Sequence, residues 1–569
     1  METVIEFRSA PGLRAWLPLL LCGSVWLSGC SSLAPAGPVP LAADCASLSG
    51  TRVEPQAIGL PSGAARITSA SLVAASPASV AERGPTPAAR ITPALPAHCR
   101  VQGAIAPLDP KAPDIQFQIN LPLQWNGRSV QYGGGGFNGV LINGLSLLPS
   151  ALYDGPVPLT QGYVTYGTDS GHQNKPGEPP QAFALNDEAL LNFAHASYKK
   201  VRDVAVAVMQ RGYGRSPEKL YFVGSSEGGR EGLTMAQRYP RDFHGIFSRV
   251  PVIHWTGLQH VGLRDGLALM NGGWMAPAQV RLVGDAVLAA CDAADGLADG
   301  IVGDPVGCRQ RFDVSQLQCK GAAADNCLTA AQVSAVRTLG SPLRLPFPLA
   351  NGLLEYPGRG PSGEALPAFA ATGGWMSWWT GSTAPSLPPA PSNGIAWFYG
   401  AGAIQYFYAR NPSLDVRSYQ PQDHAARIRE ISALMDSTNP DLGEFHANGG
   451  KLIMMENMAD YAQSPYAGIG YYESVVKHMG SAKAASFLRL YTAPGLDHVG
   501  SGAPSNVDML TALTRWVEQG EAPEGLNLLE QTVSLPAKVL RSRPLCQWPQ
   551  LPRYQGGDAN SAASFKCSP

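Results

Sequence analysis

The sequence has little charge and no cluster of Lys or Arg. Charged residues make up 15% of its 569 positions, and the formal net charge is −1. Nucleic-acid binding depends on Lys and Arg side chains that neutralise phosphates, so this composition argues against a nucleic-acid partner. Apolar residues make up 45% of the chain, which is typical of globular proteins and excludes a disordered one. We expect a globular protein larger than one ordinary domain.

An apolar run near the N-terminus is too short to favour a transmembrane helix. Residues 15–30, AWLPLLLCGSVWLSGC, follow Arg8 and Arg14 and end in small residues before a cysteine. This pattern resembles a bacterial lipoprotein signal over residues 1–30, with Cys30 lipidated in the mature protein. An ordinary secretory signal is the alternative. Both interpretations predict an exported protein, which is either lipid-anchored to the bacterial outer membrane or periplasmic or secreted, and which contacts a membrane only through the lipid.

Cysteine is scarce, with ten in the chain. If Cys22 leaves with the signal and Cys30 carries lipid, eight cysteines remain. An even number in an oxidising compartment predicts disulfides, although the sequence alone leaves the pairing open. The eight are Cys45, Cys99, Cys291, Cys308, Cys319, Cys327, Cys546 and Cys567.

Short apolar segments alternate with helical patterns along much of the chain. This alternation predicts an α/β protein with a mostly parallel sheet. Around Trp125-Asn126-Gly127, alternating apolar and polar residues also predict a β-hairpin. The other expected strands cover residues 163–166, 220–223, 245–250, 451–455 and 487–491.

Changes in composition indicate the domain boundaries. Residues 31–95 are rich in Ala, Pro and Ser, and we expect this N-terminal segment to begin as a tether. Residues 252–444 contain many Gly and Pro, clustered Trp and four of the eight cysteines, and we expect them to form an inserted lid. The catalytic α/β domain then consists of residues 96–251 and 445–569.

A G-x-S-x-G pattern occurs at residues 224–228, Gly-Ser-Ser-Glu-Gly, and is typical of the nucleophile elbow of α/β-hydrolases. Its two glycines are needed because the strand and helix backbones pass close together there. An expected strand precedes the pattern, and an expected helix over residues 227–239, stopped by Pro240, follows it. We predict Ser226 as the nucleophile; a glycine loop with incidental serines is the alternative.

The base and acid of a catalytic triad follow the nucleophile in this fold class. His498 comes after an expected strand and is the better base, whereas His478 belongs to a helical pattern. Asp460 follows the strand and loop KLIMMENMAD and is the predicted acid. Asp497 is a rival, but adjacent side chains diverge, so it could hardly orient the ring of its neighbour.

An oxyanion hole needs backbone N–H groups that point at the developing charge. One is expected from Glu227, directly after the nucleophile. The other is expected from the glycine run GGGG, at Gly135 or Gly136, where a missing Cβ lets the backbone approach substrate. A mere flexible turn is the alternative for this run.

A second group of acidic residues lies in the expected lid, in CDAADGLADGIVGDPVGC at 291–308. Asp292, Asp295 and Asp299 would repel one another unless a hard cation gathers them, and nearby glycines allow carbonyl ligands. No His is present, so Ca²⁺ suits this loop better than zinc. The alternative is a polar turn with incidental acids.

Together these motifs resemble the tannase and feruloyl esterase family, from about Cys45 to Cys567. The resemblance implies an α/β-hydrolase with a large lid and the triad Ser226, His498 and Asp460. The motifs that carry it are GGGGFNG, TDSGH at 168–172, GSSEGGREG, CDAADGLADGIV, MAD at 458–460 and GLDHVGSGAP.

The family also implies a structural calcium, disulfide pairs and one missing bridge. The calcium ligands would be Asp292, Asp295, Asp299 and the carbonyls of Leu297 and Ile301. In most members a Cys directly before the nucleophile pairs with a Cys directly after the catalytic His. Here these positions are Ser225 and Val499. Packing must therefore hold the two loops together, with Val499 filling part of the space of the missing bridge. The implied pairs are Cys45–Cys99, Cys291–Cys308, Cys319–Cys327 and Cys546–Cys567.

These features predict an exported serine esterase that acts on a small aromatic ester through an acyl-enzyme. Lid tryptophans suit a flat acyl group, and Trp379 and Trp397 are the expected pocket walls. The alternative for any single tryptophan is a place in the lid core. Members that act on terephthalate monoesters hold the free carboxylate with a lid arginine, but residues 360–409 contain no Lys or Arg. Unless Arg359 or Arg410 reaches in, neutral feruloyl, galloyl or related phenolic esters are favoured over terephthalate-type ones. A ligand-binding protein on an inactive hydrolase scaffold and an acyltransferase are the alternatives.

Overall fold

The computed structural model describes residues 37–81, 90–364, 366 and 374–569, and residues from Pro38 onward form one unit. The expected signal over 1–30 and Cys30 lie outside the described residues. Among the residues that are described, no helix is long and apolar enough to cross a bilayer.

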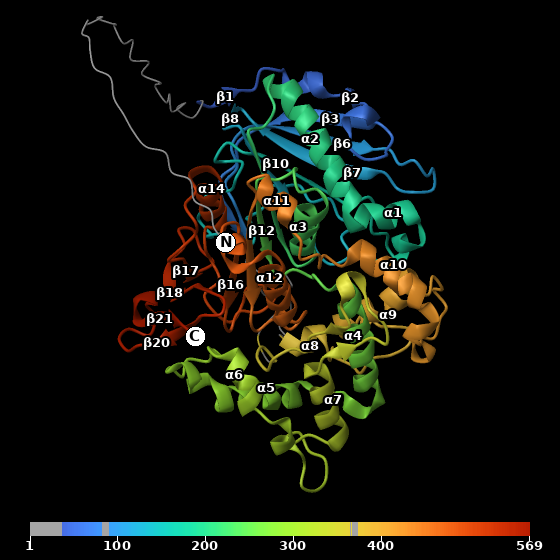
Figure 1. The fold of residues 1–569 in the computed structure, drawn as a ribbon, viewed down its shortest axis with the longest axis vertical. Helices are drawn as coiled ribbons and strands as arrows, with labels where there is room; N and C mark the ends of the chain where they lie inside the picture. The colour runs from blue at the N-terminus through green and yellow to red at the C-terminus, as the bar shows by residue number, and fades with distance from the viewer. Residues whose placement is uncertain (1–36, 82–89, 365, 367–373) are drawn as a thin grey trace, which may run out of the picture. The chain divides into compact units, whose positions relative to one another are not determined.

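An eleven-stranded mixed sheet forms the centre of the fold (Figure 1). Its strand order is β19-β16-β15-β12-β11-β9-β10-β7-β6-β3-β2. The six strands from β16 to β10 are parallel, whereas β7, β6, β3 and β2 at one end and β19 at the other are antiparallel. The expectation of a mostly parallel sheet therefore holds only for its middle. The strands are β2 Arg52–Val53, β3 Ala65–Val73, β6 His98–Ile105, β7 Ile115–Pro122, β9 Arg128–Tyr132, β10 Val164–Thr168, β11 Lys219–Ser225, β12 Gly245–Arg249, β15 Lys451–Asn457, β16 Leu488–Ala493 and β19 Cys546–Gln547.

The remaining strands form small two-stranded sheets. They are β1 Val39–Pro40 with β8 Gln124–Trp125, β4 Ser79–Ala81 with β5 Arg90–Thr92, β13 Leu343–Arg344 with β14 Glu355–Tyr356, β17 Asn527–Gln531 with β18 Val539–Pro544, and β20 Leu551–Tyr554 with β21 Phe565–Ser568.

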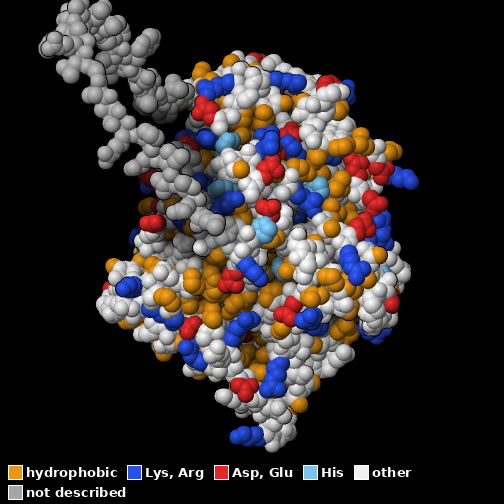
Figure 2. All heavy atoms as spheres, in the orientation of Figure 1, with side chains coloured by type: hydrophobic (Ala, Val, Ile, Leu, Met, Phe, Trp, Pro, Cys, Tyr) orange, Lys and Arg blue, Asp and Glu red, His pale blue; other side chains and the backbone are white. Residues whose placement is uncertain are grey.

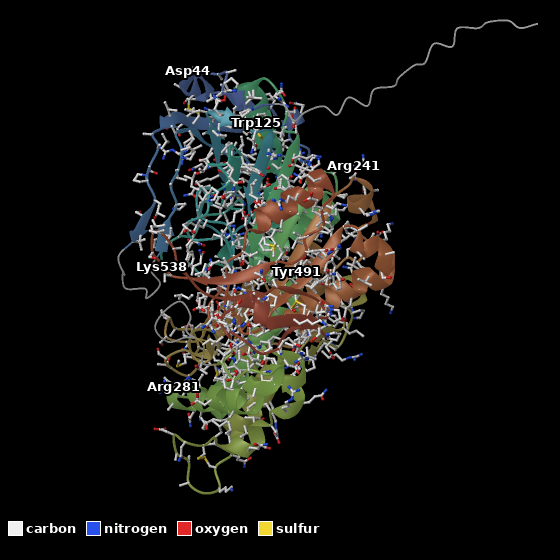
Figure 3. The ribbon with its side chains drawn as sticks, turned by 90° about the vertical axis from the view of Figure 1, so that its left-hand side faces the viewer. Asp44, Trp125, Arg241, Arg281, Tyr491 and Lys538 are labelled. Carbon is white, nitrogen blue, oxygen red and sulfur yellow. A yellow bond between two sulfur atoms is a disulfide. The ribbon has the colours of Figure 1, made fainter. Side chains whose placement is uncertain are left out.

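The hairpin expected around Trp125 is wrong. Asn126 and Gly127 do turn the chain, but β10 lies between β7 and β9, so the two strands on either side of the turn do not pair. Trp125, labelled in Figure 3, is buried and stacks on Tyr213 with ring centroids 4.5 Å apart. Its position shows that the turn serves packing against α2 (Ser197–Tyr213) rather than strand pairing.

Helices cover both faces of the parallel strands because successive strand residues point to opposite sides. On one face, Phe222 of β11 joins a core with Leu233 of α3 (Glu227–Arg238) and Val475 of α12 (Pro465–Met479). On the other, Tyr221 joins a core with Leu513 of α14 (Met509–Gln519). Both surfaces of the strand that carries the nucleophile are therefore fixed by packing.

The segment between β12 and β15 contains the helices of the expected lid. They are α4 Trp255–Ala268, α5 Pro277–Cys291, α6 Pro305–Arg311, α7 Ala330–Gly340, α8 Gly374–Trp378, α9 Ile395–Ala403, α10 Ala425–Met435 and α11 Gly443–Ala447. In Figure 1, α4 to α9 lie together in green to yellow below the sheet, whereas α11 lies higher, near α3. The other α-helices are α1 Asp187–Leu191 and α13 Ser481–Ala485.

The Ala/Pro/Ser-rich segment is part of the fold over much of its described length. Strand β3 pairs with β6 and buries Ala65 and Ile67, so the expected tether does not extend through residues 31–95. The Cys45–Cys99 disulfide joins this segment to β6. All four implied pairs are confirmed: Cys45–Cys99, Cys291–Cys308, Cys319–Cys327 and Cys546–Cys567.

Positive and negative side chains are interspersed on the face drawn in Figure 2. No large basic patch is visible among the described residues on that face. This distribution agrees with the low net charge of the sequence.

Candidate active site

Ser226 lies at the sharp turn between β11 and α3. Its backbone has φ 62° and ψ −123°, a sparsely populated conformation for a residue with a side chain. A Cβ on Gly224 would lie 2.1 Å from the carbonyl oxygen of Gly228, and a Cβ on Gly228 would lie 2.7 Å from that of Gly134. Only glycine fits at these two positions, for the reason that the motif predicted.

The structure brings the three predicted triad residues together. Nε2 of His498 lies 2.9 Å from Oγ of Ser226, and Nδ1 of His498 lies 2.6 Å from Oδ2 of Asp460. Asp460 follows β15 and His498 follows β16, so both come from the carboxyl edge of the sheet. The other carboxylate oxygen of Asp460 accepts backbone N–H groups of Ala462 and Gln463, which fixes its orientation.

The alternative acid, Asp497, and the alternative base, His478, do not belong to this triad. Asp497 turns its carboxylate into its own loop and accepts the N–H groups of Val499, Gly500 and Ser501. Burial raises its pKa to about 6. His478 is exposed at the end of α12. Asp497 thus shapes the loop that carries the histidine without contacting the ring at hydrogen-bond distance.

Ser225 is held by an arginine that sequence reasoning missed. Nη1 of Arg249, the last residue of β12, donates to Oγ of Ser225 at 3.1 Å. Burial lowers the pKa of this guanidinium. The nearby carboxyl groups, Asp497 first among them, oppose that shift. Val499 is 39% exposed and lines the same cavity as Ser225. That it fills part of the space of a bridge stays a prediction. A cation at a strand end is ordinarily solvated, and nothing in the sequence marked this one as buried.

Gly135, Gly136 and Glu227 lie with Ser226 around one cavity. The N–H of Gly135 donates to Oδ1 of Asn138 at 2.6 Å, which leaves Gly136 as the better oxyanion donor of the two. Glu227 is the first residue of α3, and the first N–H groups of a helix have no acceptor within it. Its carboxylate accepts from Nε of Arg230 at 2.7 Å, and burial raises its pKa to about 7.

The cavity has a volume of about 380 Å³ and strongly aromatic walls. Tyr399 meets both Phe137 and Trp378 edge to face, with ring centroids 4.8 Å and 5.8 Å apart. The indole of Trp378 also lies 6.1 Å from the His498 ring. The aromatic residues lining the cavity are Phe137, Trp255, Trp378 and Tyr399.

The prediction that Trp379 and Trp397 form the pocket walls is wrong. Both are buried in the lid, and neither lines this cavity. The indole N–H of Trp379 donates to the carbonyl of Tyr461 at 2.7 Å. That of Trp397 donates to the carbonyl of Ser386 at 2.9 Å. Composition predicted aromatic walls but could not tell neighbouring tryptophans apart.

Neither candidate lid arginine lines the cavity. Arg359 stacks over the Trp379 ring at 3.7 Å and donates to the carbonyl of Tyr461. Arg410 pairs with Asp187. Neither of the two arginines that the sequence left open as a carboxylate clamp therefore reaches the cavity.

The acidic loop keeps its three aspartates close to one another. Burial raises the pKa of Asp295 to about 6, and the charges of Asp299 and Asp292 contribute. Asp292 accepts the N–H groups of Asp299 and Gly300, and Asp299 pairs with Arg543 at 2.5 Å. Within the described ranges no three His, Cys, Asp or Glu side chains are arranged as a metal-binding group. Calcium held by this loop, with the carbonyls of Leu297 and Ile301, stays a prediction.

The chain shows clear similarity to known proteins. The family model described as tannase and feruloyl esterase matches residues 99–568. An uncharacterized esterase of Agrobacterium fabrum is 35% identical over 550 residues, covering 94% of each chain. The mono(2-hydroxyethyl) terephthalate hydrolase of Piscinibacter sakaiensis is 34% identical over 536 residues, covering 85% of this chain and 87% of that one. The crystal structure of feruloyl esterase B from Aspergillus oryzae has a TM-score of 0.72 at 24% identity, covering 92% of this chain and 100% of that one.

The fold is therefore that of an α/β-hydrolase, as the sequence predicted. The chain belongs to the tannase and feruloyl esterase family, and it is a carboxylic ester hydrolase.

Proposed function

We propose that the protein hydrolyses esters of aromatic acids through an acyl-enzyme on Ser226. One observation carries this proposal: the hydrogen-bonded chain Ser226, His498, Asp460 opens into a cavity walled by aromatic rings. Aromatic walls favour a flat acyl group. The names of the relatives, a terephthalate monoester hydrolase and a feruloyl esterase, point to the same substrate class.

In the proposed reaction, Nε2 of His498 takes the hydroxyl proton as Oγ of Ser226 attacks the ester carbonyl carbon. Asp460 accepts the hydrogen bond from Nδ1–H and stabilises the imidazolium. The N–H groups of Glu227 and Gly136 stabilise the oxyanion. His498 then protonates the leaving alcohol, and water attacks the acyl-enzyme with the same base.

We further propose that the acyl group is neutral, as in feruloyl or galloyl esters. Arg359 and Arg410 are engaged elsewhere, and the cation that lines the cavity, Arg249, has the carboxylates of Asp497 and Asp460 near it. A guanidinium surrounded by acids attracts a further anion weakly. Substrates with a free carboxylate are therefore disfavoured relative to neutral ones.

Export and structural calcium are also proposed. Four disulfides support an oxidising compartment. Calcium is supported by three aspartates within one short loop. Binding would require Asp299 to exchange its ion pair with Arg543 for the metal. When bound, the ion would stabilise the lid loop and take no part in the reaction.

A panel of neutral and carboxylated aromatic esters, with aliphatic esters beside them, tests the proposal on the purified protein and on Ser226→Ala. Hydrolysis of aromatic esters by the wild type alone supports it. Binding of esters without turnover by either protein would instead favour an inactive scaffold. Product esters formed from an added alcohol, in preference to free acid, would indicate an acyltransferase.

A further inference from the structure

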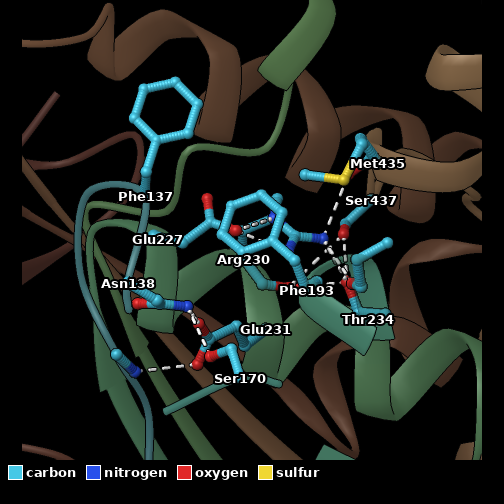
Figure 4. Close-up of polar contacts among 12 residues, drawn as sticks. Phe137, Asn138, Ser170, Phe193, Glu227, Arg230, Glu231, Thr234, Met435 and Ser437 are labelled. Atoms are coloured by element: carbon cyan, nitrogen blue, oxygen red, sulfur yellow. Dashed lines mark hydrogen bonds and ion pairs between the residues drawn. The ribbon is translucent and has the colours of Figure 1, made fainter. Parts of the chain in front are cut away.

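The glycine loop, residues 133–136, lies next to Ser226 and is hydrogen-bonded to a carboxylate that the proposed reaction does not use. Glu231 of α3 is completely buried, five residues after the nucleophile. Its Oε2 accepts the N–H of Gly134 at 2.8 Å. Its Oε1 accepts the Tyr198 hydroxyl at 2.6 Å. The same oxygen accepts Nδ2–H of Asn138 at 2.9 Å (Figure 4). Three donors therefore converge on one carboxylate in the protein interior.

Asn138 extends this support to the next residue of the loop. Its Oδ1 accepts the N–H of Gly135 at 2.6 Å, while its Nδ2 donates to Glu231 and to Oγ of Ser170 at 2.8 Å. Asn138 has φ 56°, a left-handed conformation that folds its side chain back over the loop. Two successive loop N–H groups, at 134 and 135, are thus held by side chains, and the following residue is Gly136.

The loop is also held on the other side of Gly136. Nε2 of His172 lies 2.8 Å from the carbonyl oxygen of Phe137, and the ring stacks on Phe183 with centroids 3.7 Å apart. Burial lowers the pKa of His172 to about 4, so the ring is neutral near pH 7 and donates through Nε2–H. Ser170 and His172 belong to the TDSGH motif, which the proposed reaction had left without a role.

We propose that Glu231 is a positioning residue for ester hydrolysis: its carboxylate, acting with Asn138, fixes the glycine loop so that the N–H of Gly136 is aimed at the oxyanion. This inference rests on the proposed function. A carboxylate can accept all three hydrogen bonds, because both of its oxygens are acceptors. A glutamine at this position places its NH₂ group opposite either Gly134 N–H or Asn138 Nδ2–H. Two donors cannot form a hydrogen bond with each other, so one support of the loop is lost.

The test is Glu231→Gln, measured by steady-state kinetics on an aromatic ester and by inhibition with an aryl trifluoromethyl ketone. Such a ketone forms a tetrahedral adduct with the nucleophile and places its oxyanion in the same hole. We expect kcat to fall about 10- to 100-fold with KM nearly unchanged, which is less than the loss of an oxyanion donor itself. The affinity for the ketone should fall by a similar factor, whereas a ground-state amide analogue should bind as before.

Glu518→Gln is the matched control. Glu518 of α14 also accepts a tyrosine hydroxyl, that of Tyr221 at 2.6 Å, together with Nε–H of Arg128 at 2.8 Å, but it lies outside the glycine loop. We expect this variant to lower the melting temperature and to leave both kcat and ketone affinity at wild-type values.

Glu231→Gln with wild-type kcat and ketone affinity would overturn the inference, whatever its melting temperature. If this variant does not fold, Asn138→Gly replaces it, because glycine retains the left-handed backbone and removes only the side-chain link. The same split between kcat and KM is expected there, and its absence is equally decisive. Failure of the proposed function is distinguishable, since wild type and Ser226→Ala would then have equal activity, and it would overturn this inference as well.

Discussion

Arg230→Met should destabilise the protein strongly, because Arg230 is a fully buried cation that joins the nucleophile helix to the lid. Its guanidinium donates to Oε1 of Glu227 at 2.7 Å and to the carbonyls of Ala194 at 3.0 Å and Met435 at 3.2 Å (Figure 4). Removing one partner of a buried ion pair typically costs about 3 to 5 kcal/mol. Denaturant unfolding monitored by fluorescence measures this loss.

The double variant Arg230→Met/Glu227→Gln separates the ion pair from the other hydrogen bonds. It no longer contains the uncompensated carboxylate, so it should be more stable than Arg230→Met alone. The cost that remains comes from the carbonyls of Phe193, Ala194 and Met435, which lose a donor. Each unsatisfied buried group costs about 1 to 3 kcal/mol. A double variant no more stable than the single one would refute the assignment of the loss to the buried charge.

The pH dependence of the stability of Arg230→Met gives an independent check on the role of the buried charge. Burial raises the pKa of Glu227 to about 7 in the folded protein, while Arg230 opposes the rise. A raised folded-state pKa means that the folded state holds the proton more tightly, so stability is lost as pH rises from the ordinary carboxyl range toward that value. Without Arg230 the pKa rises further, and that of Glu231 moves in the same direction. The deficit of Arg230→Met should therefore be larger at pH 8 than at pH 5, and equal deficits at the two pH values would contradict this account.

Three further outcomes are expected. Ser226→Ala should lose esterase activity by on the order of 10⁶-fold in kcat without unfolding, whereas Ser225→Ala should stay active; equal activity in both would move the nucleophile elsewhere. Chelation of calcium should lower the melting temperature and Asp295→Ala should mimic it, while identical melting of metal-free and calcium-loaded protein would leave the loop an ordinary turn. The double variant Ser225→Cys/Val499→Cys should oxidise to a disulfide and retain activity, because both positions line the cavity. The bond needs Cα atoms about 4.4 to 6.8 Å apart, so two thiols that persist after mild oxidation would show that the loops do not meet this closely.

Local sequence patterns predicted the elements that carry the site. The strand before Ser226 and the helix after it were predicted almost to the residue, because the apolar run, the glycines and Pro240 are local signals. The hairpin at Trp125 failed because strand β10, far along the chain, inserts between the two segments. Pairing order depends on such non-local packing, which a turn signal does not contain.

The same distinction separates the residues of the site. Ser226, His498 and Asp460 follow expected strands, and their positions could be read from spacing. Trp378 is the last residue of α8 and Trp379 follows it directly. Adjacent side chains point in different directions, so composition alone could not tell which one lines the cavity. Arg249 was missed because its burial depends on the loops that surround it.

The site is assembled where the parallel strands end. The glycine loop follows β9, Ser226 follows β11, Asp460 follows β15 and His498 follows β16, so the carboxyl ends of these strands meet at one edge. Among its described residues, the lid adds aromatic walls to that edge, whereas the groups proposed to transfer a proton or to stabilise the oxyanion come from the α/β domain. In the proposed function, reaction and substrate selection are therefore assigned to different parts of the chain. Under the proposed function, a substitution in an aromatic wall residue such as Trp378 should therefore change the choice of acyl group more than it changes the triad.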